Sequence, residues 1–314
     1  MTNLHYSLAG KKIWVAGHRG MVGAALVRQL ETIDCNIITA THGELDLTRQ
    51  TDVEHWMAEN KPDAIFMAAA RVGGILANDT YPVEFLIDNM KIETNVFSAA
   101  HAVGVNRMVF LGSSCIYPRL AAQPMNEDAL LTGPLEPTNQ WYAIAKIAGV
   151  MMTQAYRRQH GRDYISCMPT NLYGPGDNFD LNESHVLSAL IVKAHQAKEA
   201  DAESFAVWGT GNPKREFLYV DDLAQACVFL MERYSADETI NVGCGEDITI
   251  RDVAQTVADV VGFTGTITND LHKPDGTPRK FMDSGRINAL GWHASTSLKE
   301  GIAKTYAWYL EHGA

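Results

Sequence analysis

The sequence predicts an α/β fold, in which a doubly wound parallel sheet is followed by a smaller mixed α/β lobe towards the C-terminus. The first observation is a buried-strand pattern at residues 11–17 that runs into a glycine-rich turn and then a helical stretch at residues 24–31. The second is that strand-like and helix-like segments keep alternating up to about residue 172. This alternation specifies a parallel sheet with helices on both faces.

The individual elements follow from the hydrophobic pattern. Helical periodicity covers residues 82–102 and 140–160, and further strand patterns lie at residues 36–42, 61–70, 107–112 and 163–169. The strand segments are largely apolar, as strands buried on both faces are. After Gly176 the alternation loosens, although a helix is still expected at residues 184–200. We expect a first domain at residues 1–172, rejoined by residues 216–246, and a second lobe at residues 173–215 and 247–314.

The composition is typical of a soluble globular protein. Of 314 residues, 46% are hydrophobic and 20% are charged. No apolar run approaches the ~18 residues of a membrane helix, so no membrane partner is expected. The net charge of −11 argues against nucleic acid as a partner, although a local basic cluster would still bind an anionic small molecule. Five scattered cysteines predict neither a disulfide framework nor a metal cage, and they fit a reducing cytoplasm.

A glycine-rich turn joins the first strand to the first helix. Gly17, Gly20 and Gly23 are spaced three apart, and the residues between them are His18, Arg19, Met21 and Val22. Glycines allow a tight turn and a close approach of backbone to a pyrophosphate, while the helix N-terminus offers free N–H groups and positive potential. Strand, glycine turn and helix in this order predict a Rossmann-type dinucleotide site.

The end of the second strand discriminates between NAD and NADP. NAD-binding units usually place Asp or Glu about 20 residues after the glycine loop, where it holds the ribose hydroxyls. Here the strand ends in Thr41 and His42, and no acid occurs before Glu44. Because an acid would repel a 2′-phosphate, its absence permits NADP(H), and Arg19 is a candidate partner for that phosphate.

Tyr142 and Lys146 are candidates for proton transfer. They lie four residues apart in a helical run, so both side chains project from one face, one turn apart. An ammonium group beside a phenol favours the phenolate, so Lys146 is expected to lower the pKa of Tyr142. Such a tyrosine gives or takes a proton at a carbonyl oxygen. Seen alone, the pair would equally suit a buried Tyr and a surface Lys on an ordinary helix.

Together with Ser113, which follows a strand in between, these motifs resemble the extended short-chain dehydrogenase/reductase superfamily. Within it the chain is most similar to the GDP-L-fucose synthase family, over nearly its whole length. The glycine loop and the Tyr142–Lys146 spacing mark only the superfamily, whereas residues 113–118 and 274–280 are far more specific. The resemblance implies an NADP-dependent enzyme that converts GDP-4-keto-6-deoxy-D-mannose to GDP-L-fucose by epimerisation at C3 and C5 and hydride reduction at C4.

The chemistry of the sugar suggests roles for the matching residues. A ketone at C4 acidifies the hydrogens on C3 and C5, and donors from Tyr142 and Ser113 would stabilise the resulting enolate. Cys115 and His185 match the family's epimerisation pair, and thiols and imidazoles titrate near the working pH. Each of the two residues has an ordinary alternative, as a buried thiol and as a residue at a helix start. In the reduction, Tyr142 would protonate the C4 oxygen while Lys146 holds the nicotinamide ribose.

The resemblance also implies the residues that bind cofactor and substrate. For the cofactor they are the whole stretch from Gly17 to Gly23, then His42, Leu111, Gly112, Ser113, Ser114, Lys146, Pro169, Thr170, Asn171, Leu172 and His185. The family usually carries an arginine at the position of His42, so the NADP preference is expected to be weaker here. For the GDP-sugar they are Lys193, Trp208, Arg215 and Asp275, with Lys280 as a further basic candidate. Lys193 and Arg215 suit the diphosphate.

The same superfamily commonly dimerises through the helices expected at residues 82–102 and 140–160, so a homodimer is expected, although their apolar faces could equally be internal. Three alternative functions are compatible with parts of the sequence. A GDP-L-colitose synthase would epimerise only C5. A hexose 4-epimerase with bound NAD is disfavoured by the missing acid after the second strand and by the presence of Cys115 and His185. A non-catalytic NAD(P)-sensing protein is disfavoured because Ser113, Tyr142 and Lys146 are all present.

Overall fold

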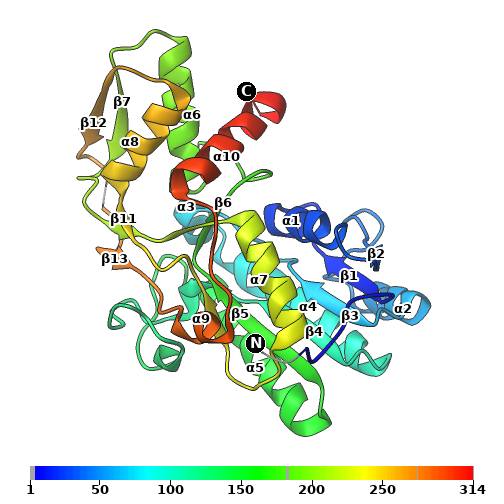
Figure 1. Cartoon of the computed structure of the whole chain (residues 1–314). Helices are drawn as coiled ribbons and strands as arrows, with labels where there is room; N and C mark the ends of the chain where they lie inside the picture. The colour runs from blue at the N-terminus through cyan, green and yellow to red at the C-terminus, as the bar shows by residue number, and fades with distance from the viewer. Residues whose placement is uncertain (1–3, 182–183, 274, 314) are drawn as a thin grey trace.

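A six-stranded parallel sheet forms the main body of the protein. The structure is a computed structural model, and it describes residues 4–181, 184–273 and 275–313. Its strands are β1 (Lys12–Ala16), β2 (Asn36–Ile38), β3 (Ala64–Met67), β4 (Arg107–Leu111), β5 (Asp163–Pro169) and β10 (Ile240–Val242). They lie in the order β10-β5-β4-β3-β1-β2, and every neighbouring pair is parallel (Figure 1). The chain leaves β1 towards β2 on one side and returns to β3 on the other. Ligands of such sheets bind at this switch point, beyond the carboxyl ends of the strands.

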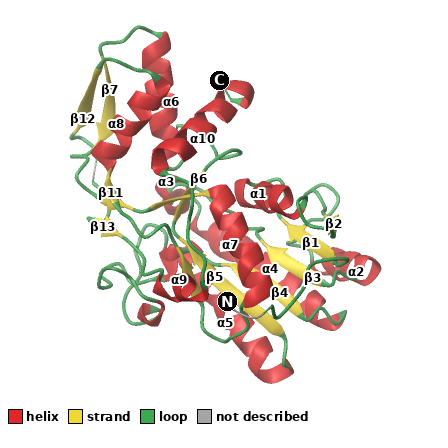
Figure 2. Ribbon diagram, in the orientation of Figure 1, coloured by secondary structure: helices red, strands yellow, loops and turns green. Residues whose placement is uncertain are grey.

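Helices cover both faces of the sheet (Figure 2). One layer holds α1 (Met21–Leu30), α7 (Val220–Arg233) and α9 (Gly285–Leu290), and the other holds α2 (Gln50–Asn60), α4 (Pro82–Ala102) and α5 (Gln140–His160). Side chains of β1 alternate between the two cores: Ile13 and Val15 join the first, Trp14 and Ala16 the second. Strands buried on both faces pack in this way. The doubly wound α/β prediction is confirmed.

A second lobe has its own core. Its helices are α6 (Val186–Glu199), α8 (Ile250–Val261) and α10 (Leu298–His312), which pack with the paired strands β7 (Ser204–Trp208) and β12 (Thr266–Asp270). This lobe lies at the upper left of Figure 1. Two small sheets lie between the lobe and the main body: β11 (Ile248–Thr249), β8 (Lys214–Arg215) and β13 (Arg279–Lys280) form one, and β6 (Asn171–Tyr173) with β9 (Phe217–Tyr219) forms the other. The short helices are α3 (Ile75–Thr80), η1 (Ser114–Ile116) and η2 (Glu127–Ala129).

The chain passes between these two parts more than once. Helix α7 and strand β10, from the segment 216–246, lie in the main body. Helix α9 also contributes there, because Ile287 and the following Trp292 belong to the same core cluster as α1 and α7. The predicted division placed residues 247–314 in the second lobe. Its boundaries stay a prediction, and α9 is a segment of that range that packs on the main sheet.

Strand β2 is shorter than the sequence pattern suggested. Its ladder with β1 covers Asn36 to Ile38, whereas the apolar pattern continued to residue 42. The next residues leave the sheet, and Thr41 turns back so that its N–H and hydroxyl both donate to Glu44 Oε2 at 2.8 Å. A side-chain acceptor three residues on competes with the edge-strand ladder for the backbone donor. His42 therefore lies in a turn beyond the strand.

Helix α5 packs directly on β4 at Gly149. A Cβ atom placed on this residue would lie 2.1 Å from Cζ of the Phe110 ring. Phe110 is fully buried in the core between the sheet and α5. The helix therefore approaches the strand more closely than a position with a side chain would allow. None of the helices in the described ranges combines the length and apolar character needed to cross a membrane.

We expect Gly149→Ala to lower the free energy of unfolding by about 1–3 kcal/mol, because overpacking against a fully buried ring outweighs the better helix propensity of alanine, roughly 1 kcal/mol. Urea unfolding monitored by circular dichroism measures the change. Gly43→Ala is the control: no atom lies within 4 Å of a Cβ there. Equal stabilities for the two variants would show that α5 can move away from β4 at little cost.

Candidate active site

The glycine loop lies at the switch point of the sheet. Gly17 has φ +86°, and a Cβ atom on it would lie 2.7 Å from the backbone of Ala69, just beyond β3. Only glycine combines this left-handed conformation with so close an approach. Gly20 precedes α1 without a side-chain hydrogen bond to the helix. The first N–H groups of α1 thus lack a side-chain cap, an arrangement that suits a phosphate.

A cavity of about 290 Å³ lies between this loop and the turn after β2. It brings together two predicted cofactor residues, Arg19 and His42, and its lining also includes Gly17, His18, Gly20, Ala40 and Thr41. The nearest acid in the sequence, Glu44, is bound to Thr41 and interacts with His18. The cavity thus has an arginine and two histidines on its wall. These residues fit a dinucleotide that carries an additional phosphate on its ribose.

Tyr142, Ser113 and Lys146 meet where β4 ends against α5. Tyr142 is partly buried, and its phenol makes a hydrogen bond with the Ser113 side chain. Lys146 is buried, and its Nζ donates to the Leu111 carbonyl at 3.0 Å. The same Nζ lies 4.7 Å from the centroid of the Phe110 ring and 5.9 Å from that of Tyr142. The structure therefore brings the three predicted residues together.

The pKa of Tyr142 differs from the sequence-based expectation. Burial raises it above its ordinary value, the nearby Cys115 and Glu93 raise it further, and the hydrogen bond with Ser113 lowers it. Lys146 was expected to lower this pKa, but its ammonium is paired with Glu93, Nζ to Oε1 3.4 Å. The negative partner offsets the positive charge at the phenol, and desolvation of the phenolate then dominates.

Cys115 lies in η1, the short helix that begins directly after Ser113. Its N–H donates to Ser113 Oγ at 3.2 Å. Its Sγ accepts hydrogen bonds from Asn139 Nδ2 at 3.2 Å and from Lys280 Nζ at 3.5 Å. Lys280 was predicted to contact the substrate, and in the structure it faces this thiol. Asn139 is a further residue of the site that the sequence does not indicate, because nothing near it shows that it reaches residue 115.

His185 occupies a different element. It is the exposed residue that precedes α6, and it interacts electrostatically with Asp177. Burial raises the pKa of Asp177 and His185 opposes the rise, while Ser188 donates a hydrogen bond to the same carboxylate. Residues 182–183, just before His185, lie outside the described part of the chain. The predicted pairing of His185 with Cys115 across the substrate stays a prediction.

The segment after β5 is held by Glu216. Pro169 ends β5, and the Thr170 hydroxyl and Asn171 Nδ2 both donate to the Glu216 carbonyl, at 3.4 and 2.8 Å. The Glu216 carboxylate is fully buried and accepts N–H groups from Gly245 at 2.9 Å and Met282 at 3.2 Å. These bonds hold Asn171 and Leu172, both predicted to border the cofactor, at the carboxyl end of the sheet.

The predicted substrate residues gather around the loop that ends in β13. Lys193 Nζ lies 5.3 Å from the Trp208 ring centroid, and Lys273 Nζ lies 4.9 Å from it. Burial lowers the pKa of Lys193, which Asp270 opposes. Arg215 donates to the Thr277 carbonyl at 2.6 Å. These residues form a basic, aromatic surface on an acidic protein. Lys273 belongs to this surface, although the sequence alone did not indicate it.

Asp275 has a structural role within this loop. Its Oδ1 accepts from the Thr210 N–H and its Oδ2 from the Thr210 hydroxyl, both at 2.8 Å. Its predicted contact with a ribose or base would have to use the remaining lone pairs of these two oxygens. Pro274, the first residue of the specific 274–280 motif, lies outside the described residues.

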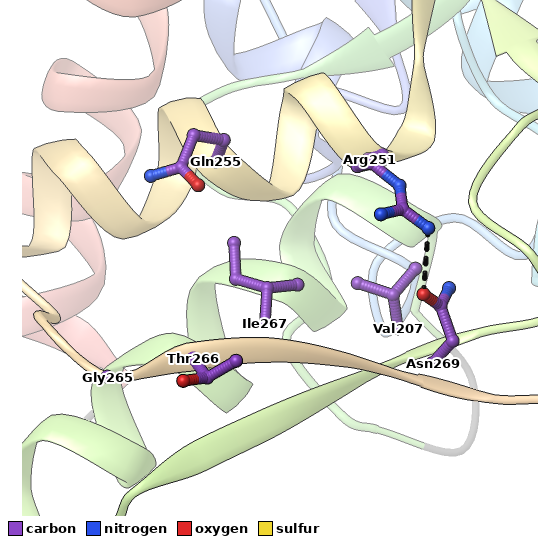
Figure 3. A pocket seen from close by; sticks show the side chains of 7 residues that line it. All are labelled: Val207, Arg251, Gln255, Gly265, Thr266, Ile267 and Asn269. Atoms are coloured by element: carbon purple, nitrogen blue, oxygen red, sulfur yellow. Dashed lines mark hydrogen bonds between the residues drawn. The ribbon is translucent and has the colours of Figure 1, made fainter.

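A larger cavity, about 320 Å³, lies between α8 and the β7–β12 pair (Figure 3). Its lining includes Val207, and successive side chains of a strand point to opposite faces, so it lies on the other face of β7 from Trp208. Arg251 and Asn269 on its wall are bonded to each other at 2.9 Å. None of the predicted site residues lines it.

The fold and the site define a dinucleotide-binding enzyme with a phenol, an ammonium and a thiol at the carboxyl end of the sheet. Residues 13–243 match the model of the NAD dependent epimerase/dehydratase family. The chain belongs to this family. A GDP-L-fucose synthase from Sinorhizobium fredii is 55% identical over 98% of this chain and 98% of its own, and GDP-L-fucose synthase 1 of Arabidopsis thaliana is 57% identical over 96% and 94%.

Solved structures agree with this placement. A GDP-L-fucose synthetase from Naegleria fowleri bound to NADP is 28% identical, with a TM-score of 0.90 over 98% of this chain and 96% of that chain. A GDP-L-colitose synthase from Yersinia pseudotuberculosis is a more distant relative, 36% identical over 95% of this chain and 98% of its own.

Proposed function

We propose that this protein is an NADPH-dependent enzyme that converts GDP-4-keto-6-deoxy-D-mannose to GDP-L-fucose, by epimerisation at C3 and C5 followed by reduction at C4. The observation that carries the proposal is the placement of a thiol, Cys115, beside the Ser113–Tyr142 pair. A reductase alone needs only the phenol, whereas inversion of carbons next to a ketone also needs a group that exchanges their protons. The names of the relatives at 55% and 57% identity support the same reaction.

The residues around the C4 oxygen serve both steps. Removal of a proton from C3 or C5 places negative charge on that oxygen, and the hydroxyls of Ser113 and Tyr142 stabilise it. Cys115, held by Asn139 and Lys280, exchanges the proton on one face of the sugar, and His185 serves the other face. Bound NADPH supplies the hydride for C4. Tyr142 then gives its proton to the C4 oxygen, which yields the alcohol.

The GDP moiety is assigned to the basic surface of the second lobe. Lys193, Lys273 and Trp208 offer two cations and an exposed indole face, and Arg215 adds a planar guanidinium. Arg215 and Lys280 are register partners in β8 and β13. Cationic side chains therefore form a continuous row from the basic surface of the second lobe to Cys115. Such a row suits a diphosphate followed by its sugar.

The GDP-L-colitose alternative is less well supported, because the colitose synthase is only 36% identical.

For the assembly we propose a homodimer through α4 and α5. Val83 and Ile87 of α4 and Trp141 and Ile144 of α5 are exposed large hydrophobic side chains on these two packed helices. A mass of about twice 34.5 kDa in solution would agree, and a monomer mass would contradict it. We place the protein in the cytoplasm, since its five cysteines are free thiols.

Tyr142→Phe is expected to lower the rate of NADPH oxidation with GDP-4-keto-6-deoxy-D-mannose by at least about 100-fold, because it removes the general acid. Nicotinamide absorbance follows the rate, and the dissociation constant for NADPH should stay within about twofold of wild type. Tyr156→Phe, on the same helix, is the control. A variant at position 142 that still reduced the sugar at a wild-type rate would refute the role of this phenol.

Cys115→Ala is expected to separate the two activities. Without the thiol the proton exchange at C3 and C5 slows by roughly 100-fold or more, whereas hydride transfer to the unepimerised ketone remains possible. Incubation in ²H₂O with mass spectrometry counts the exchanged protons, and NMR identifies the product. Cys35→Ala removes a partly buried thiol elsewhere and should leave exchange unchanged. Wild-type deuterium uptake by Cys115→Ala would show that another residue is the base.

Arg19→Ala is expected to weaken NADPH binding by about tenfold and NADH binding much less, because a charge-assisted contact to the additional phosphate is lost. Fluorescence titration of both cofactors measures this ratio. Arg49→Ala, an exposed arginine at the start of α2, is the control. Equal weakening of both cofactors would mean that Arg19 does not recognise the 2′-phosphate.

A further inference from the structure

Glu93 is a buried carboxylate that the catalytic roles above leave unused. It lies in the middle of α4, and only 1% of its side chain is exposed. Acidic residues are almost never so buried unless they are paired. Its partner is Lys146, across the packed faces of α4 and α5, with Nζ 3.4 Å from Oε1. Beyond this ion pair, neither carboxylate oxygen has a hydrogen-bond partner among the described residues.

This pairing is costly for an ordinary structural role. Removing a carboxylate from water costs several kcal/mol, and a structural ion pair offsets this with additional hydrogen bonds to the carboxylate. Glu127 and Glu216, two other buried carboxylates, do have such bonds, from Asn241 N–H and from Gly245 and Met282 N–H. Glu93 lacks such bonds, and its Oε1 is paired with the ammonium that lies beside the Tyr142 ring.

We propose that Glu93 is a positioning residue for the reduction step: its carboxylate holds the Lys146 ammonium beside Tyr142, and its charge governs how strongly that ammonium acts on the phenol. The proposal rests on the proposed function, in which Tyr142 gives its proton to the C4 oxygen. With Glu93 ionised, the phenol keeps its proton to higher pH. With Glu93 neutral, the ammonium is uncompensated and the phenolate is favoured.

The titratable groups around Glu93 are few. On α5 they are Lys146 and Tyr142, and on η1 Cys115 acts on the same phenol. On α4 itself Asp88 pairs with Arg71, and Lys91 is exposed. The ionisable side chains of the adjoining helices are exposed: Asp52, Glu54, His55 and Glu59 of α2 and Asp79 of α3. Burial raises the pKa of Glu93 to about 7, and Lys146 opposes the rise. The switch in charge thus falls within the working range.

The test is the pH profile of kcat/KM for Glu93→Gln, with the full chain, NADPH and the keto-sugar nucleotide. Wild type and variant should agree within about twofold near pH 6, where Glu93 is largely protonated. Above pH 7 the variant should lose activity at lower pH than wild type, because the pKa values of both Tyr142 and Lys146 fall when the carboxylate is removed. Each unit of displacement gives about tenfold lower activity on the basic limb.

Two further variants distinguish charge from packing. Glu93→Met keeps the volume without the carboxylate and should reproduce the displaced basic limb. Glu127→Gln removes a buried carboxylate elsewhere and should leave the limb in place. A loss for Glu93→Gln and Glu93→Met that is the same at every pH would overturn the proposal and leave Glu93 with a packing role only.

Thermal unfolding separates this proposal from the proposed function, because it needs no turnover. The unfolded chain loses the Glu93 proton near its usual value of 4.5, whereas the folded protein keeps it to about 7. The stabilising contribution of the raised pKa is therefore present below 4.5 and is lost as the pH rises to about 7. The Tm of Glu93→Gln relative to wild type should rise between pH 5 and pH 8, even if the sugar substrate is a different one. A Tm difference that is independent of pH would contradict the proposal.

Discussion

The Glu216 side chain is fully buried, and it accepts backbone N–H groups from Gly245 after β10 and from Met282 after β13. Its own carbonyl accepts from Asn171 after β5, and its N–H donates to the Lys280 carbonyl at 3.4 Å. A buried carboxylate is tolerated only when its lone pairs are used in this way. One residue thus connects the end of the main sheet to the small sheet that carries Lys280. The contact of Lys280 with Cys115 depends on this connection.

Different parts of the molecule supply the two groups of residues in the proposed active site. Tyr142 is placed among groups of opposing effect: burial, Cys115 and Glu93 raise the pKa of its phenol, and Ser113 lowers it. All of these groups belong to the main body, where they lie on α4, on α5 and in the segment after β4. The second lobe supplies the cations and the exposed Trp208. In the proposed function, the groups that set the pKa of Tyr142 therefore belong to the main body, whereas the lysines and Trp208 assigned to GDP belong to the second lobe.

Most of the fold could be predicted from the sequence, and so could the site residues that belong to short motifs, since both depend on local patterns. Apolar strands, the glycine loop and the four-residue spacing of Tyr142 and Lys146 each lie within a short segment, and the residues of α4 and α5 were predicted at their observed limits. The contacts that were missed join distant segments. Nothing near Lys280 indicates that its side chain reaches residue 115, and Glu93 reads as a polar position in a helix until the packing of α4 on α5 is known.

The absence of a side chain at Gly149 sets the height of α5 above β4, since a single Cβ there would reach the Phe110 ring. Tyr142 and Lys146 stand on that helix, seven and three residues earlier, and Lys146 Nζ bonds to the strand at Leu111. The positions of both side chains above the sheet therefore depend on how closely Gly149 of α5 approaches Phe110 of β4. A bulkier residue at this contact would push α5 away from the sheet, and Tyr142 and Lys146 would move with the helix that carries them.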